Sequence, residues 1–427
     1  MKGDGDVVER TVQEVEVEIE QKEERLQNRQ NRKEIFLPLS ISGLLEILGL
    51  TIKEDKVNKL ITFLCCLSAY TESSQFNISF NAPSSTGKSY IPIEIASLFP
   101  KEDVIKVGYC SPTAFFHDKG KFVKEQEGYF VDLERKILIF LDQPHTLLLQ
   151  HLRPLLSHDE KEINIKITDK SQKYGLKTKN IVIKGFLSVI FCSAGLKIDE
   201  QEATRFLLLS PETNQGKIKQ GIDEALNKEA DLEAYLAKLN NNPQRQLLIN
   251  RIKGIKEENI TAIKIHNPDK IREWFFEKHK ALKPRHQRDI KRLVSIIKSF
   301  TLLNLWHREA EGLDIILTSD EDIEAGFRIW EEISFSQELN LPPYIYRMFK
   351  EVILPLYQEK ETGLSRKAIM QGYFRIYNRP VADWVLRQQI IPMLETAGLI
   401  IQEADPTDKR KILISPTTPL TISQEEI

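Results

Sequence analysis

The sequence is poor in cysteine and lacks any long apolar run. Its four cysteines lie in apolar surroundings without metal-ligand spacing, at Cys65, Cys66, Cys110 and Cys192. This pattern excludes a disulfide-stapled secreted scaffold and a cysteine-type zinc finger. No apolar stretch approaches the roughly 20 residues that a membrane-spanning helix needs, and the acidic N-terminal segment has no signal-peptide core. We therefore expect a soluble, cytoplasmic protein without a membrane partner.

An excess of charge of either sign is also absent. The 427 residues contain 60 Lys and Arg against 62 Asp and Glu, a formal net charge of −2. Any nucleic-acid binding must therefore come from local basic patches. A chain of this length predicts two or three domains, at roughly 100–200 residues per domain.

The first half of the chain changes character near residue 35. Residues 1–34 form a highly charged arm, in which 15–20 alternate with the period of a strand and the rest is typical of a solvated helix or a flexible arm. Over 35–215, short apolar strands alternate with helical stretches, at 76–80, 104–107, 137–141 and 187–192. This alternation predicts an α/β unit with a mostly parallel sheet and helices on both faces.

The second half is expected to be mainly helical. Residues 216–338 show helical periodicity with almost no strand pattern, and 417–427 form a short tail. Residues 339–416 predict helices at 366–376 and 381–397 followed by a hairpin whose turn carries Lys409 and Arg410. This order is that of a winged helix, with Arg387 on the recognition helix and the turn near backbone phosphates. A protein-contact role for the same unit is the alternative.

A phosphate-loop pattern follows the first predicted strand. It occupies residues 82–89, namely Ala82, Pro83, Ser84, Ser85, Thr86, Gly87, Lys88 and Ser89, with alanine in the place usually held by the first glycine. Small residues let backbone N–H groups surround phosphates, and the helix that follows adds its positive end. Lys88 is then expected to reach the β- and γ-phosphates of ATP, and Ser89 to bind Mg²⁺.

A carboxylate ends the third predicted strand, which is a continuous apolar run typical of a central parallel strand. Asp142 at its carboxyl end is placed to hold the Mg²⁺ shell, while a buried strand that merely ends in a capping Asp is the alternative. Gln143 follows where a glutamate commonly polarises the attacking water. Glutamine orients water but cannot accept its proton, so the catalytic base stays unassigned.

Two segments are rich in basic residues. Residues 161–185 predict a β-hairpin with seven lysines against Glu162 and Asp169, and its tip carries Lys170, Lys173, Tyr174 and Lys177. Such a tip suits sequence-independent DNA binding, and a lysine edge that only prevents strand aggregation is the alternative. Residues 264–298 carry eleven Lys or Arg against four acids. This segment is expected to face DNA or a nucleotide, and a helix face exposed only to solvent is the alternative.

The order of these parts resembles the AAA+ ATPases. It is most similar to the branch with a hairpin before the first sensor, which includes the minichromosome-maintenance helicases and the ATPases that accompany primases on phages and mobile elements. The resemblance covers roughly residues 40–335. It places Ser193 on the first sensor, Arg205 of Thr204-Arg205-Phe206 on the arginine finger, and Arg285 or Arg288 on the second sensor.

The resemblance implies an AAA+ P-loop core, a helical lid and a C-terminal winged helix. It also implies a ring, a hexamer by expectation, that hydrolyses ATP with Mg²⁺ to move along single-stranded or forked DNA, with a primase or another replication protein on a separate chain. Arg205 then completes the site of a neighbouring copy. The alternatives are a DNA-bound regulatory ATPase that uses ATP as a switch, and a winged-helix binding module with a vestigial nucleotide site.

Overall fold

The computed structural model describes residues 4–108, 121–123, 128–143, 145–169, 177–193, 205–360 and 362–417. Its centre is a sheet of five strands in the order β2-β5-β8-β1-β9, and every neighbouring pair is parallel. The strands span Ile78–Asn81 (β1), Val104–Val107 (β2), Ile137–Phe140 (β5), Ser188–Ser193 (β8) and Leu207–Leu209 (β9). The predicted α/β class and parallel sheet are confirmed, and β9 is a strand that the sequence pattern did not reveal.

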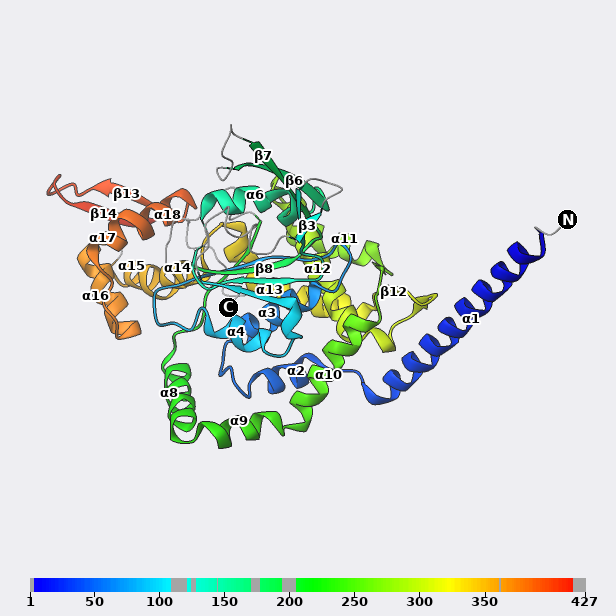
Figure 1. Ribbon diagram of the computed structural model, residues 1–427. Coiled ribbons are helices and arrows are strands. Elements are labelled where there is room, and N and C mark those ends of the chain that lie inside the picture. The colour runs from blue at the N-terminus through cyan, green and yellow to red at the C-terminus, as the bar shows by residue number, and fades with distance from the viewer. Residues whose placement is uncertain are drawn as a thin grey trace.

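Both faces of this sheet are covered, because alternate side chains of each strand point to opposite faces. Ile137 and Ile139 join a core with helices α3 (Lys56–Ser68), α4 (Tyr90–Ala96) and α12 (His286–Leu303). Leu138 and Phe140 face the other way and pack with α6 (Thr146–Leu156). Figure 1 shows α3 and α4 below the sheet and α6 above it.

A second sheet lies beyond α6 and contains the predicted hairpin. Its strands are Lys121–Val123 (β3), Gly128–Asp132 (β4), Glu162–Asp169 (β6) and Lys177–Lys184 (β7), in the order β3-β4-β7-β6. The antiparallel β6–β7 pair confirms the predicted hairpin over 161–185. The sequence did not predict its parallel pairing with β4, which extends the hairpin into a sheet.

The N-terminal arm is one helix, α1 (Asp4–Ile35). The strand interpretation of 15–20 is therefore wrong, and of the two interpretations of the rest of the arm the helix is confirmed. Glu, Gln, Arg and Lys are good helix formers, and they dominate this segment. Arg25 and Arg32 hold the end of α1 to the body through Asp314 and Glu258, while Figure 1 shows the rest of α1 projecting away from it.

Residues 216–338 are mainly helical, as expected. The helices are α8 (Gln215–Ala230), α9 (Leu232–Asn240), α10 (Pro243–Glu257), α11 (Pro268–Lys278), α12 and α13 (Asp320–Glu338). Strands are nearly absent, as expected, apart from β10 (Ala262–Lys264), β11 (Ala310–Glu311) and β12 (Ile315–Leu317), which form a small sheet that the sequence did not predict. Strands of two or three residues are too short to show a period of two. Helices α12 and α13 share the core of the central sheet, so this region is packed onto it.

The C-terminal unit has its own hydrophobic core. Its helices are α14 (Pro343–Met348), α15 (Leu354–Lys360) and α16 (Arg366–Tyr377), followed by a helical run that comprises α17 (Asp383–Val385), a π-helical turn (Leu386–Ile390) and α18 (Ile391–Thr396). Gly398 has a φ of +72°, which favours glycine, and ends that run. Strands β13 (Ile400–Ala404) and β14 (Ile412–Pro416) then form the predicted hairpin. Among the described residues, no helix combines the length and apolar character needed to cross a bilayer.

Candidate functional site

Polar segments leave three neighbouring strands at one edge of the central sheet. Residues 82–89 follow β1, Asp142 and Gln143 come shortly after β5, and Ser193 ends β8, which lies between the other two strands. The register pairs Asn81 with Ser193, and the backbone N–H of Ala82 donates to the Ser193 carbonyl at 3.4 Å. Because parallel strands share one carboxyl edge, these sequence-predicted residues meet there, at the usual ligand edge of an open α/β sheet.

The loop after β1 has an unusual backbone. Ser85 and Gly87 both have left-handed φ angles, +64° and +88°, on either side of Thr86. Alternation of left-handed and ordinary residues turns successive N–H groups toward one point and creates an anion-binding concavity. The Thr86 hydroxyl braces the turn by donating to the Pro83 carbonyl at 3.0 Å. The two left-handed residues and this hydrogen bond make a tight turn that is compatible with such a concavity.

Lys88 lies folded over this loop. Its Nζ donates to the Pro83 carbonyl at 2.9 Å. Burial lowers the pKa of Lys88, the Cys192 thiol and the Asp142 carboxylate oppose that shift, and Arg379 adds to it. Lys88 is therefore within electrostatic reach of Asp142 and of Arg379 from the C-terminal unit.

Gln143 is held by its neighbours on both sides. Its backbone N–H donates to the Asp142 carboxylate at 2.7 Å, and its side-chain Oε1 accepts a hydrogen bond from the Ser193 hydroxyl at 3.0 Å. The hydroxyl of Ser193 thus orients Gln143 at the edge where a nucleotide's terminal phosphate is expected. A glutamine in this position can hold a water molecule but cannot take its proton.

A cavity of about 1200 Å³ opens beside the loop. The loop contributes Ala82, Pro83, Ser85, Thr86 and Gly87 to its wall, and helix α8 and the segment before α3 contribute others. Among the described residues, Lys88, Ser89, Asp142, Arg285 and Arg288 do not line it. Its volume exceeds the roughly 300–1000 Å³ of common small-molecule sites, so a nucleotide has ample room.

The wall also contains charged residues that sequence reasoning missed. Asp55 is fully buried, accepts hydrogen bonds from Asn58 and from the Glu212 backbone, and is ion-paired with Lys217 of α8. Arg347 and Arg379 enter the same cavity from the C-terminal unit. No local motif marks these residues, since only the fold brings them beside the loop.

Arg205 lies at the opposite edge of the sheet. It lies two residues before β9, which runs parallel to β1 and pairs Leu207 with Ile78, so Arg205 belongs to the amino edge. Its Nε donates to the Ser157 hydroxyl at 2.8 Å at the end of α6. Arg205 is therefore remote from the phosphate loop of its own chain.

The basic segment 264–298 is largely neutralised by carboxylates from other elements. Lys264, Lys270, Lys278 and Lys283 pair with Glu311, Glu324, Glu331 and Glu338, all distant in sequence. Arg285 and Arg292 both pair with Asp289 on the same helix. The structure therefore compensates locally much of the charge that the sequence count assigned to this segment.

The predicted DNA-binding residues fall in two places. Arg387 is exposed on the π-helical turn, and Lys409 and Arg410 are exposed in the turn between β13 and β14, where Arg410 pairs with Asp408. At the other hairpin, Lys170, Lys173 and Tyr174 lie outside the described residues, and Lys177 begins β7. The structure thus brings the loop at 82–89, Asp142, Gln143 and Ser193 to one edge of the sheet, whereas Arg205 lies at the other edge and Arg285 and Arg288 do not line the cavity. The described candidates for DNA contact lie at the start of β7, on the π-helical turn and in the turn between β13 and β14.

The fold is that of an α/β protein with a five-stranded parallel sheet, and the loop at 82–89 lies at the carboxyl end of that sheet. Comparisons with known proteins add no relative, because neither a family model nor a curated protein matches the chain.

Proposed function

We propose that the carboxyl edge of the central sheet binds and hydrolyses ATP. The observation that carries this proposal is the loop at residues 82–89, where left-handed Ser85 and Gly87 shape an N–H concavity and Lys88 lies near Asp142. In the nucleotide complex, Lys88 leaves the Pro83 carbonyl for the β- and γ-phosphates. The Ser89 hydroxyl and the Asp142 carboxylate are hard oxygen ligands, and that donor set fits Mg²⁺.

The catalytic steps follow from the residues around that loop. Ser193 holds Gln143 through a 3.0 Å hydrogen bond, and Gln143 positions the attacking water. Arg205, at the opposite edge, serves the site of a neighbouring copy, where its guanidinium stabilises charge on the transferred phosphoryl group. This division of labour requires a ring or another closed oligomer, and a hexamer is our working expectation.

We assign the energy of hydrolysis to movement along DNA. The five-stranded parallel sheet, the β6–β7 hairpin and the lid support an AAA+ core, and helices α14 to α18 followed by β13–β14 support a winged helix. The β6–β7 tip grips the strand, and the C-terminal unit adds contacts through Arg387, Lys409 and Arg410. Replication of a virus or mobile element is the setting, with a primase or other replication protein as partner.

Two features favour a second function. Gln143 stands where a proton-accepting glutamate promotes fast hydrolysis, and Arg347 and Arg379 of the C-terminal unit line the nucleotide cavity. A DNA-bound ATPase that uses ATP as a switch needs slow turnover and a unit that senses the nucleotide. Helicase loaders and transposition regulators belong to this class.

Steady-state ATP hydrolysis with and without single-stranded DNA tests the first function. We expect DNA-stimulated turnover in the wild type and a loss of about 100-fold or more in Lys88→Ala, since the lysine contacts the transferred phosphoryl group. Arg205→Ala should lose the stimulation as well. Matched controls are Lys101→Ala and Arg328→Ala, which remove exposed cations from η1 (Lys101–Asp103) and α13.

The same assay distinguishes the two functions. If ATP binds without measurable turnover and Gln143→Glu restores hydrolysis, the switch replaces the motor. If Lys88→Ala binds and hydrolyses ATP as the wild type does, the nucleotide site itself is wrong.

A further inference from the structure

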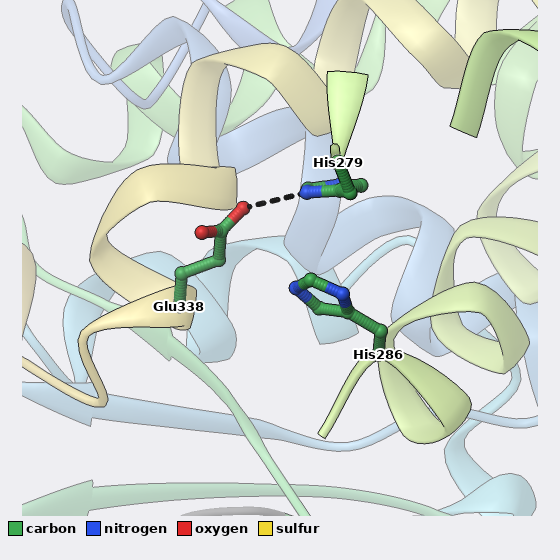
Figure 2. Close-up of side chains that lie close together, drawn as sticks. All are labelled: His279, His286 and Glu338. Atoms are coloured by element: carbon green, nitrogen blue, oxygen red, sulfur yellow. Dashed lines mark ion pairs between the residues drawn. The ribbon is translucent and has the colours of Figure 1, made fainter. Parts of the chain in front are cut away.

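Three side chains capable of binding a metal ion converge at one end of the lid, and none of them lines the nucleotide cavity. His279 directly follows α11, His286 begins α12, and Glu338 is the last residue of α13. One potential ligand atom from each residue lies within 4.8 Å of the other two. Figure 2 shows the carboxylate of Glu338 and the two imidazole rings turned toward one another.

The buried ring of His286 is the second observation that points to a ligand. This residue is only 5 % exposed, and its Nε2 has no hydrogen-bond partner among the described residues. Figure 2 shows the ring facing His279 and Glu338. Buried polar atoms in proteins are nearly always satisfied, so an unsatisfied imidazole nitrogen aimed at another histidine and a carboxylate requires an explanation.

The other two residues are already arranged as a pair. His279 Nδ1 lies 3.0 Å from Glu338 Oε1, and the centroids of the two imidazole rings are 4.4 Å apart. Two ligands held at about 2.0–2.1 Å from a tetrahedral zinc ion lie roughly 3.3 Å from each other. An ion can therefore replace the proton between His279 and Glu338 with little movement, and the ligand atom of His286, which lies within 4.8 Å of the other two, has to approach by at most about 1.5 Å.

We propose that His279, His286 and Glu338 form a zinc site that keeps its fourth position for water. Two imidazole nitrogens and one carboxylate form a ligand set typical of Zn²⁺, whereas Mg²⁺ and Ca²⁺ prefer oxygen alone. The site is independent of the proposed ATPase activity. Its structural effect is to fasten the α11–α12 connection to the end of α13, where the chain departs for the C-terminal unit.

Two local interactions are lost when the ion binds. His286 Nδ1 accepts a 3.2 Å hydrogen bond from the Lys283 backbone, so the proton of the neutral ring resides on Nε2. Coordination through Nε2 moves that proton to Nδ1 and gives up this long hydrogen bond. The Lys283 ammonium group, 3.8 Å from the second oxygen of Glu338, has to turn away. Its side chain is half exposed and can do so.

The test is zinc binding by the full chain after removal of metal with a chelator. Zn²⁺ is titrated in competition with a chromophoric chelator, for the wild type and for His279→Gln, His286→Gln and Glu338→Gln. We expect one ion per chain and a loss of affinity of about tenfold or more in each variant, since changes even to residues that only support ligands cost 10–100-fold. Exposed His266→Gln and Glu331→Gln, from the same region, are the matched controls.

A thermal unfolding series guards against a variant that simply misfolds. Zinc should raise the melting temperature of the wild type and of both controls, but not that of the three ligand variants, which should melt near the metal-free wild type. Co²⁺ in place of Zn²⁺ should give the visible absorption of a four-coordinate site. The proposal is overturned if the wild type binds no zinc, or if His286→Gln and Glu338→Gln bind it as tightly as the wild type.

Discussion

The two edges of the central sheet are built from similar residue types but are organised differently. At the carboxyl edge, most of the loop at 82–89 borders an open cavity, which charged groups from distant elements also line, and Gln143 is held beside the loop by Ser193. At the amino edge, Arg205, Ser157 and His158 lie among hydrogen bonds and apolar contacts. Asn77, just before β1, further closes this edge by donating to the Leu156 carbonyl.

This difference shows how chemistry is distributed in a parallel sheet. The loops that follow the strands lie at the carboxyl edge, outside the sheet, where they can form a ligand site. The amino edge receives the ends of returning helices, here α6, and its polar groups are engaged in holding them. An arginine at that edge acts on a nucleotide only when another copy of the chain brings one to it.

Among the changes that compare the two edges, the largest is expected in the stability of the protein at acid pH, through the amino edge. The His158 ring packs against Phe186 at a centroid distance of 4.7 Å, and its Nε2 is buried without a hydrogen-bond partner among the described residues. Burial lowers the pKa of His158 from 6.5 to about 4, and the nearby Lys291 adds to this. Between pH 6.5 and pH 4, His158 is protonated in the unfolded chain but neutral in the folded chain. Stability is therefore complete above pH 6.5 and falls toward pH 4.

Urea unfolding followed by tryptophan fluorescence measures this effect. We expect the wild type to lose about 2 kcal/mol between pH 7 and pH 5 through His158, from 1.36 kcal/mol per pKa unit. His158→Asn removes the titrating ring and tolerates the left-handed φ of +57° at this position. The variant should lose that much less stability over the same interval. An identical loss in both proteins would show that the amino edge accepts the proton without cost.

Those parts of the fold and of the candidate site that consist of one continuous segment could be predicted from the sequence. Strands β1, β2, β5 and β8 and the loop at 82–89 are continuous segments, and each was recognisable from its own residues. Strand β4 was missed because its pairing with β7 is a tertiary contact. Arg379 was missed as a neighbour of Lys88 for the same reason.

The net charge of a surface is likewise hard to predict from one segment of the sequence. The local count over 264–298 indicated a strongly basic surface, whereas Glu311, Glu324 and Glu331 of other elements neutralise three of its lysines. The cluster of His279, His286 and Glu338 likewise has no sequence motif, because it forms only when α11, α12 and α13 pack together.

A smaller effect is expected at the carboxyl edge, from the C-terminal unit. Arg379 is exposed, lines the cavity and lies near enough to lower the pKa of Lys88. A cation there favours bound phosphate, so Arg379→Ala should weaken ATP binding about fivefold, equivalent to about 1 kcal/mol. Titration with a fluorescent ATP analogue measures it. Arg375→Ala, an exposed arginine on α16 outside the cavity, is the control, and equal affinities for both variants would remove Arg379 from the site.

The smallest effect concerns the hydroxyl group that positions Arg205. Ser157 accepts a 2.8 Å hydrogen bond from Arg205 Nε, and Ser157→Ala removes that acceptor. If Arg205 serves a neighbouring copy, DNA-stimulated kcat should fall about threefold with KM for ATP nearly unchanged, since one hydrogen bond contributes about 0.5–1.5 kcal/mol. Ser157→Thr keeps a hydroxyl group and should retain the wild-type rate. Equal kcat values for Ser157→Ala and Ser157→Thr would mean that the amino edge only holds α6, and the contrast between the two edges would then be one of structure alone.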